Sequence, residues 1–304
     1  MERKEQIRVG LIGFGEIGST LGRGLRAGGL EHVVAYDKYA FDGPFSELIQ
    51  RRAAECGVEL VRSPQELASR ADCIISATPG SSSIKSAEAF ASLLRPQHLI
   101  VDIASATPQV KQQVAERLAA SGASFVDGSI VGTPADGVAM PILVAGIHAE
   151  RVRDTLVPCG MRMEFVSERI GDASAIKILR SVVMKGLEAL LLECMLGARR
   201  YGLEAPVLAS LEKTLSKPFS RVVNGMLATN AIHSARRSEE ADMSAETLEN
   251  VGLDPFVTRA VAERLRWVTG LGMKAHFGGV VPKDYEEALA AIETKIAPAD
   301  SLAR

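Results

Sequence analysis

A glycine-rich turn near the N-terminus has the residue types and spacing that hold a dinucleotide. It follows the first apolar run, opens a helical pattern, and consists of Gly13, Phe14, Gly15, Glu16, Ile17 and Gly18. Glycines at these positions allow a sharp bend, a close approach of backbone N–H groups to a pyrophosphate, and tight packing of helix on strand. The helix N-terminus adds partial positive charge. We therefore predict that these six residues bind a cofactor.

An acidic residue, Asp37, ends the second apolar run, 19 residues beyond Gly18. A carboxylate at this point accepts hydrogen bonds from the adenine ribose hydroxyls and repels a 2′-phosphate, so it favours NAD over NADP. The adjacent Lys38 is also a candidate cofactor ligand, and its charge leaves NADP open.

Two later loops are expected to border the same cofactor. Ala77, Thr78 and Pro79 follow one apolar run, and Ser105 follows the next. Ligands of open α/β sheets lie at the carboxyl ends of the strands, where these residues should fall. The alternative is that they are ordinary loop residues without a ligand.

Short apolar runs of strand length recur through the first half of the chain, at residues 7–12, 33–36, 73–76, 99–103, 124–126, 142–145 and 163–166. Amphipathic stretches such as residues 17–27 and 107–120 separate most of them. This alternation predicts a parallel sheet covered by helices on both faces. We predict an α/β, Rossmann-type domain over residues 1–167 and an all-α domain over 168–304 that binds substrate and forms oligomers.

The all-α part is predicted to begin with one long helix. It starts near Asp172, runs to Arg200, and has Gly202 just beyond it as a C-terminal cap. Apolar residues occur on nearly all of its faces, so we expect it to be buried on most sides.

The composition excludes several classes of function. The 35 basic and 37 acidic residues leave a formal charge of −2, without the positive field that nucleic acids or anionic membranes attract. The four cysteines form no CxxC pair, which argues against a disulfide framework or a metal site and suits reduced thiols. Residues 1–6 lack the features of a signal peptide. These features predict a cytoplasmic protein whose partners are small molecules or other subunits.

Four segments, in order, resemble the β-hydroxyacid dehydrogenase superfamily, which includes 3-hydroxyisobutyrate and 6-phosphogluconate dehydrogenases. They are the glycine turn and residues 101–108 (VDIASATP), 127–133 (DGSIVGT) and 171–177 (GDASAIK). The resemblance covers essentially the whole chain, and residues 171–177 are its most specific part. The C-terminal half resembles the phosphogluconate-dehydrogenase-type helical module of poorly characterised members.

The resemblance implies that Lys177 is the general acid/base. Oxidation of an alcohol by hydride transfer requires a group that takes the hydroxyl proton, and partial desolvation lowers the pKa of a lysine toward neutrality. The five histidines stand in no catalytic pattern. The alternative readings of Lys177 are a solvated helix residue or a partner of Asp172.

The remaining substrate ligands depart from the family pattern. Where relatives carry Ser-Gly-Gly, this chain has Val131, Gly132 and Thr133, and where relatives hold the substrate with His or Asn it has Arg180 and Ser181. Together with Ser105, these residues are the predicted substrate ligands. Arg180 suits a carboxylate, which its guanidinium binds through two hydrogen bonds.

Helical spacing places Lys177, Ser181, Lys185 and Glu188 on one face, which we expect to line a cleft. Lys185 and Glu188 are equally consistent with a structural salt bridge. Arg236 and Arg237, in a later helix, are either solvated or contacts for an acidic substrate.

The sequence thus predicts reversible, NAD-linked oxidation of a small β-hydroxy acid, with decarboxylation of the product left open. Two alternatives stay open: an imine reductase-like enzyme, against which the presence of Lys177 counts, and a non-catalytic NAD-binding protein. The resemblance also implies a homo-oligomer, a dimer or larger.

Overall fold

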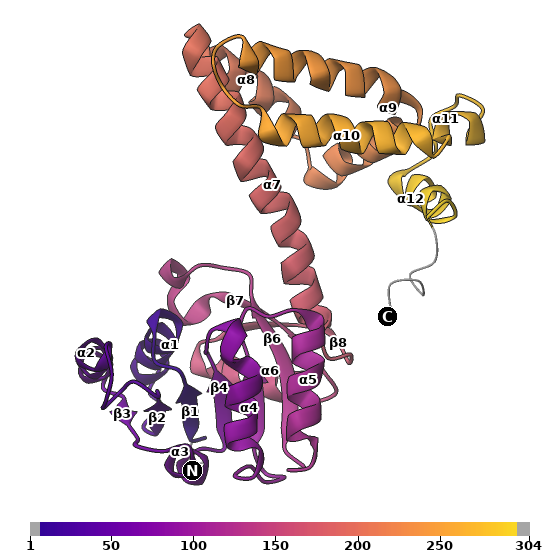
Figure 1. Cartoon of the computed structure of the whole chain (residues 1–304). Coiled ribbons are helices and arrows are strands. Elements are labelled where there is room, and N and C mark those ends of the chain that lie inside the picture. Colours follow the sequence, from indigo (N-terminus) through magenta and orange to yellow (C-terminus); the bar gives the residue numbers. More distant parts are fainter. Residues whose placement is uncertain (1–6, 297–304) are drawn as a thin grey trace. The chain divides into compact units, whose positions relative to one another are not determined.

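The computed structural model describes residues 7–296 (Figure 1), so Met1–Gln6, on which the absence of a signal peptide was judged, lie outside the described residues. Contacts divide the chain into two compact units, Met1–Val182 and Val183–Arg304. The division falls inside the long helix α7 (Asp172–Tyr201), whose first turns belong to the first unit. The domain limit expected at residue 167 stays a prediction.

The first unit is built on an eight-stranded sheet in the order β3-β2-β1-β4-β5-β6-β7-β8. Its strands are β1 (Val9–Ile12), β2 (Val33–Tyr36), β3 (Glu59–Leu60), β4 (Cys73–Ser76), β5 (Leu99–Asp102), β6 (Ser124–Ile130), β7 (Pro141–Ala145) and β8 (Arg162–Ser167). Neighbouring strands are parallel except for β6 and β7, which run antiparallel. The α/β fold is therefore confirmed, and the sheet is mixed where a purely parallel one was expected.

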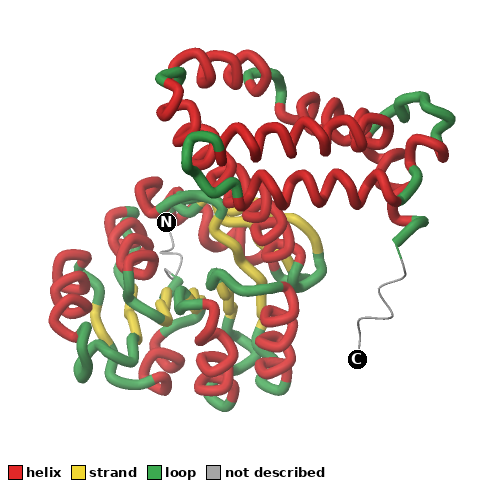
Figure 2. The backbone as a smooth tube through the Cα atoms, turned by 45° about the horizontal axis from the view of Figure 1, so that its top comes forward, coloured by secondary structure: helices red, strands yellow, loops and turns green. Residues whose placement is uncertain are grey.

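Helices pack on both faces of this sheet (Figures 1 and 2). One apolar core holds side chains of α1, α2 and α6, for example Leu21, Ile49 and Val152. The other holds side chains of α3, α4 and α5, for example Leu67 and Phe90. The six helices are α1 (Glu16–Ala27), α2 (Ser46–Cys56), α3 (Pro64–Arg70), α4 (Ser83–Ala91), α5 (Pro108–Ala119) and α6 (Ala149–Leu156). Both strand faces are covered, which explains why the strands read as continuous apolar runs.

The strand β6 continues four residues past the predicted end at Val126. The extension contains Asp127, Gly128 and Ser129, of which aspartate and glycine are types that are depleted in strands. They stay in the strand because β7 pairs with them, Asp127 opposite Ala145 and Ser129 opposite Leu143. The two-residue strand β3 was missed because no apolar run marks it.

The strand order changes direction between β1 and β4, since β2 and β3 lie on one side of β1 and β4 to β8 on the other. At such a switch point the loops that follow neighbouring strands turn to opposite faces and leave a crevice at the carboxyl ends. The glycine turn after β1 lies at this point.

The second unit is helical, with α9 (Phe219–Glu249) packed against α10 (Phe256–Gly270). A small core joins Ile232, Val268 and Met273. The other helices after α7 are α8 (Glu204–Leu215), α11 (Met273–His276) and α12 (Tyr285–Glu293). Among residues 7–296, no helix combines the length and apolarity that crossing a bilayer requires.

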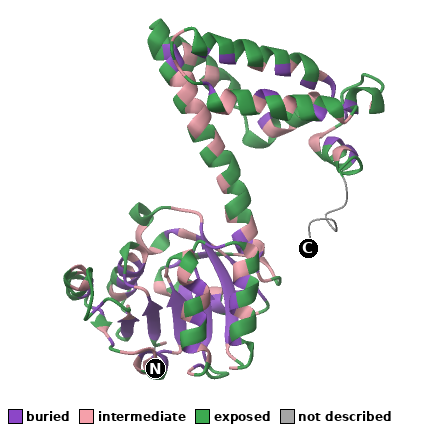
Figure 3. Cartoon of the chain, in the orientation of Figure 1, coloured by how far each residue is buried: buried purple, intermediate pink, exposed green. Residues whose placement is uncertain are grey.

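The helix α7 begins and ends where predicted, with Gly202 at φ +69° just beyond it. Its start is held by a residue distant in sequence: the Asp127 carboxylate accepts the backbone N–H groups of Gly171 and Ser174, each at 3.1 Å. The expected burial on most sides is wrong for the single chain. Leu179 and Val182 are each 68% exposed, and much of the helix is coloured as exposed in Figure 3.

Candidate cofactor and catalytic site

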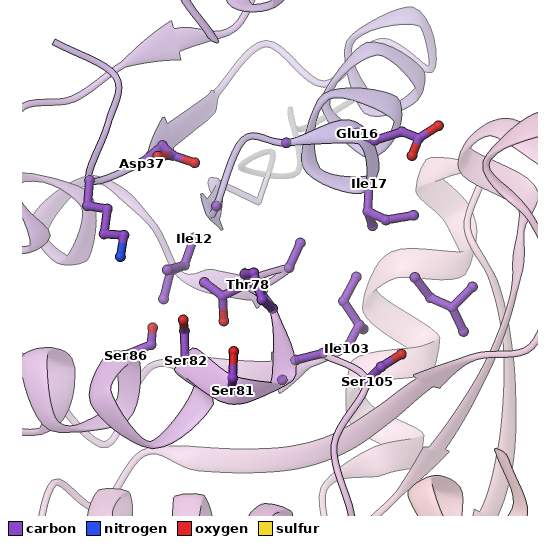
Figure 4. A pocket seen from close by; sticks show the side chains of 18 of the residues that line it. Ile12, Glu16, Ile17, Asp37, Thr78, Ser81, Ser82, Ser86, Ile103 and Ser105 are labelled. Carbon is purple, nitrogen blue, oxygen red and sulfur yellow. The ribbon is translucent and has the colours of Figure 1, made fainter. Parts of the chain in front are cut away.

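A cavity of about 1130 Å³ lies within the first unit, at the carboxyl ends of β1, β2, β4 and β5 and beside the start of α7. Figure 4 shows Asp37, Thr78 and Ser105 around it, each from a different strand end. Small-molecule sites measure roughly 300–1,000 Å³, so the cavity has room for a large ligand. Its position at the switch point is where this class of fold binds nucleotides.

The glycine turn has the geometry that a pyrophosphate site requires. Gly13 adopts φ +87°, in the left-handed region that favours glycine. A Cβ on Gly18 would lie 2.1 Å from the Gly13 carbonyl oxygen, so helix and turn pack too closely for any side chain there. Gly15 is different, because a Cβ on it would meet no atom within 4 Å. Protein packing does not demand glycine at position 15, whereas a ligand that approaches the backbone closely does.

The N-terminus of α1 is open toward a ligand. Its N-terminal cap residue is Gly15, which offers no side chain to cap the first N–H groups. Glu16 and Ile17, the first residues of the helix, line the cavity. The free N–H groups and the helix dipole favour an anion at this end.

Asp37 clamps the glycine turn as well as facing the cavity. One carboxylate oxygen accepts the backbone N–H of Phe14 at 2.8 Å, and the other accepts that of Tyr39 at 2.9 Å. An ionised carboxylate has about four acceptor sites. Two acceptor sites of Asp37 remain for ribose hydroxyls. Asp37 therefore shapes the glycine turn and is also suited to contact a dinucleotide.

The loops after β4 and β5 meet at the cavity. Ala77, Thr78 and Pro79 line it, and so does Ser105. A Cβ on Gly80 would lie 1.8 Å from the Ser105 carbonyl oxygen, which shows how tightly the two loops pack. Among the described residues, the buried Thr78 hydroxyl has no hydrogen-bond partner. A buried hydroxyl without a partner in the protein fits a ligand-binding role.

Sequence reasoning missed part of the lining. Beyond Asp37 the cavity is walled by Tyr39, Phe45, Leu48, Ile49 and Arg52. Phe45 is 55% exposed, and apolar side chains in the part of the lining that contains Asp37 suit an adenine ring. Aromatic residues soon after Asp37 were an available signal. Around Thr78, the serines Ser81, Ser82 and Ser86 and the amine of Lys85 add polar groups.

Lys177 lines the cavity from α7, whereas Asp37 lines it from the end of β2. Its Nζ donates a hydrogen bond to Ser105 Oγ at 2.5 Å. The side chain is half-buried, and its pKa lies below the ordinary lysine value, first because burial disfavours the charged amine and second because the positive charge of Lys111 repels it. Asp172, the alternative partner, instead bonds to Ser167 and Arg169. The site thus contains an amine suited to proton transfer.

Four of the other predicted substrate ligands line the same end of the cavity: Val131, Gly132, Arg180 and Ser181. The Ser181 hydroxyl donates to the Lys177 carbonyl oxygen at 2.9 Å, which leaves its oxygen as an acceptor. Arg180 is exposed. An exposed guanidinium that lines the cavity can pair with an incoming carboxylate.

Three predicted ligands do not line the cavity. The Phe14 side chain is fully buried in the core, because the turn directs it beneath the sheet face. Gly18 is pressed against Gly13. The backbone N–H and hydroxyl of Thr133 both bond to Asp136, at 2.8 and 3.2 Å, where they cap a short 3₁₀ helix.

The later charged residues take other positions. Lys185 and Glu188 are exposed residues of the second unit. On α9, Arg236 pairs with Glu240, and Arg237 donates to Thr229 Oγ1 at 2.8 Å. Within residues 7–296, no histidine lines the cavity and no His, Cys, Asp and Glu side chains gather in a group able to hold a metal ion.

Comparisons with known proteins agree with a nucleotide-binding first unit. Residues 8–162 match the family model described as the NAD binding domain of 6-phosphogluconate dehydrogenase, and residues 198–268 match a domain of unknown function, DUF1932. Bovine (Bos taurus) mitochondrial 3-hydroxyisobutyrate dehydrogenase is 25% identical over 213 residues, which cover 67% of this chain and 60% of that enzyme.

Two solved structures cover most of the chain. A conserved hypothetical protein from Sinorhizobium meliloti 1021 is 31% identical over 97% of this chain and 98% of its own, with a TM-score of 0.61. An imine reductase variant from Myxococcus stipitatus, in complex with NAD+, is 17% identical over 88% of this chain and 94% of its own, with a TM-score of 0.71. At that identity the likeness shows the fold alone.

Proposed function

Since the chain belongs to the β-hydroxyacid dehydrogenase superfamily of NAD(P)-dependent oxidoreductases, we propose that it oxidises a small β-hydroxy acid reversibly with NAD. The observation that carries this proposal is the hydrogen bond of Lys177 Nζ to Ser105 Oγ in the cavity that the glycine turn borders. An amine with a lowered pKa beside a nucleotide site is what proton-coupled hydride transfer requires.

The chain's own residues have separable roles. The turn from Gly13 to Gly18 and the α1 N-terminus would hold the pyrophosphate of the cofactor, and Asp37 would hold its adenine ribose. When bound, the nicotinamide supplies the hydride acceptor. Lys177, in its neutral form, takes the proton of the substrate hydroxyl as the C–H bond is broken, so alcohol becomes ketone. Ser105 orients the amine and the hydroxyl.

Arg180 supports an acidic substrate. It is exposed, lies one turn from Lys177 on α7, and lines the cavity. A carboxylate paired with Arg180 would bring a nearby hydroxyl toward the amine, with Ser181, Gly132 and Val131 completing the pocket. A β-keto acid product can lose its carboxylate, and product analysis decides whether it does so here.

A panel of β-hydroxy acids tests the proposal, phosphorylated and aromatic members included, with each of NAD and NADP and absorbance of the reduced nicotinamide as readout. We expect turnover with at least one member. A panel of cyclic imines with the reduced cofactors runs in parallel. Turnover of imines alone favours the imine reductase alternative, and cofactor binding with no turnover in either panel favours a non-catalytic protein.

Asp37→Ala is expected to weaken NAD binding by roughly tenfold to 100-fold, because a hydrogen bond to a charged group contributes about 1.5–3 kcal/mol. NADP should lose less, since the repulsion of its 2′-phosphate is removed as well. Titration of each dinucleotide by calorimetry measures both constants. A variant that binds NAD as the wild type does would refute the ribose role of Asp37.

We also propose that the protein is a homo-oligomer in the cytoplasm. Large apolar side chains of α7 are exposed in the single chain, including Leu179, Val182 and Leu192 at 63–68%. Exposed large apolar side chains on one helix favour an interface, and a second copy of the chain is an occupant that is always present. All four cysteines are free thiols, which suits a reducing compartment. Light scattering measures the mass in solution.

A further inference from the structure

A buried cluster of charged side chains lies beneath the site. Lys111, on α5, is fully buried. Its Nζ lies 3.1 Å from Asp102 Oδ2 and 3.7 Å from Asp127 Oδ1, and both carboxylates are also buried. The amine donates to two carbonyl oxygens as well, that of Asp102 at 2.5 Å and that of Gly128 at 3.3 Å. A lysine is almost never buried so fully unless it is paired, as Lys111 is here.

One arm of the cluster supports Ser105. Asp102 is the last residue of β5, and its carboxylate accepts the backbone N–H of Ala104 at 3.1 Å. This bond shapes the turn that presents Ser105, the next residue, to the cavity. Lys111 donates a hydrogen bond to the carbonyl oxygen of Asp102 and forms an ion pair with its carboxylate, so it fixes the end of the strand from which Ser105 projects.

The other arm supports Lys177. Asp127 accepts the N–H groups of Gly171 and Ser174 and, at 2.7 Å, the Ser174 hydroxyl. Ser174 lies one helical turn before Lys177 on α7. Lys111 Nζ lies 3.7 Å from Asp127 Oδ1, the oxygen that accepts the Ser174 hydroxyl, so the amine of α5 and the start of α7 share one carboxylate.

We propose that Lys111 is a positioning residue, which locks the loop bearing Ser105 and the helix bearing Lys177 into one register so that their hydrogen bond forms. The inference rests on the proposed role of Lys177 as the acid/base. It goes further by assigning a task to three buried residues that touch neither substrate nor cofactor. Geometric control of this kind matters because a misplacement of about 1 Å can cost about 100-fold in rate.

Lys111 also acts on Lys177 through its charge. Its positive charge is the second cause, after burial, of the lowered pKa of Lys177. The other charged groups around this amine are the buried carboxylates on β5 and β6, Asp172 and Arg180 on α7 itself, and Arg169 in the turn before it. Without Lys111, the buried carboxylates would face Lys177 uncompensated, so its pKa would rise.

The test compares Lys111→Gln with the wild type. We expect kcat to fall by about 10- to 100-fold while KM and the NAD dissociation constant change by less than about twofold. Oxidation requires neutral Lys177, so the rise of kcat/KM with pH should move to higher pH. Competitive acetylation followed by peptide mass spectrometry should show the same upward movement for the Lys177 amine, with no turnover needed.

Two further variants separate positioning from stability. Leu118→Ala removes a buried side chain at the far end of α5; it should lower the melting temperature but leave kcat and the Lys177 labelling midpoint unchanged. Asp127→Asn replaces Lys111→Gln as the test if the latter does not fold. The asparagine keeps the size of the residue, but its side-chain nitrogen cannot accept the hydrogen bonds that one carboxylate oxygen accepts. Amide exchange at residues 171–174 should then accelerate, and kcat should fall without a matching change in KM.

The positioning role is overturned by a folded Lys111→Gln or Asp127→Asn protein whose kcat and Lys177 labelling midpoint match the wild type. It is also overturned if Leu118→Ala, with the same loss of stability as Lys111→Gln, lowers kcat as much as Lys111→Gln does. Failure of the proposed function looks different. In that case Lys177→Ala retains turnover, while the labelling of Lys177 still reports the influence of Lys111.

Discussion

Lys177→Ala is expected to lower turnover by about 100-fold or more, the usual contribution of a positioned general acid or base. The amine is half-buried, its pKa is lowered by desolvation, and its nitrogen donates to Ser105 at 2.5 Å. NAD binding should persist, because the glycine turn and Asp37 do not contact this side chain. Steady-state kinetics and calorimetric titration of NAD measure the two quantities.

The pH profile makes this result specific. In the wild type, oxidation should accelerate as pH rises through the lowered pKa of Lys177, because only the neutral amine accepts a proton. That limb should vanish in Lys177→Ala. The exposed lysine Lys213, on α8, supplies the control, since Lys213→Ala should retain both the rate and the limb. Turnover near the wild-type value in Lys177→Ala would eliminate the assigned role.

Lys111→Met is expected to lower the free energy of unfolding by about 3–5 kcal/mol, the cost of leaving a buried charge without its partner. The methionine keeps most of the side-chain volume, but the carboxylates of Asp102 and Asp127 lose the amine that lies 3.1 and 3.7 Å from them. Urea denaturation at pH 7, followed by circular dichroism, measures the change. A loss below about 1 kcal/mol would mean that the cluster contributes little.

The same variant should respond to pH in a defined direction. Burial raises the pKa of the Asp127 carboxyl, and Lys111 is the strongest opposing influence. A group whose pKa is raised by folding contributes stability that is fully present below its unfolded pKa and is lost as pH rises through the folded pKa. Removal of Lys111 raises this pKa further, so the deficit of Lys111→Met should be smaller at mildly acid pH than at neutral pH.

A double variant identifies the partner. In Lys111→Met/Asp102→Asn, the close pair is removed together, whereas Asp127 keeps its three donors at the start of α7. We expect it to be more stable than Lys111→Met alone, because one uncompensated buried carboxylate has gone. If the double variant is less stable than the single one, the Asp102 charge is not what Lys111 compensates.

The nucleotide-binding fold was predictable because its signals are local. A glycine turn between an apolar run and an amphipathic stretch, followed by an acidic residue, occupies positions 13–37 and needs no distant contact to be recognised. The long helix α7 was equally predictable from the sequence, because its apolar residues and Gly202 mark where it ends. Lys177 was singled out by resemblance, and its environment could not be read from the sequence.

Non-local contacts account for what was missed or wrong. The carboxylate that accepts the N–H groups at the start of α7 belongs to Asp127, 44 residues before Gly171 in the chain, so no local pattern identifies it. The antiparallel β7 could not be distinguished from a parallel strand, because a short buried run has the same composition in either direction. Of the residues beyond Asp37 that wall the cavity, Tyr39 and Phe45 lie in a loop, where periodicity gives no signal, and the others lie in α2, whose spacing does not show which face meets a ligand.

Sequence alone determined most of the strands and helices, the position of the glycine turn, and the lysine near the start of the long helix, because these depend on spacing within a short stretch of chain. Only the tertiary structure decided that Lys177 donates a hydrogen bond to Ser105, 72 residues away, and that the fully buried Lys111 pairs with the carboxylates of Asp102 and Asp127. Burial and charge pairing arise from the packing of β5, β6, α5 and α7 against one another, and no window of sequence contains all four.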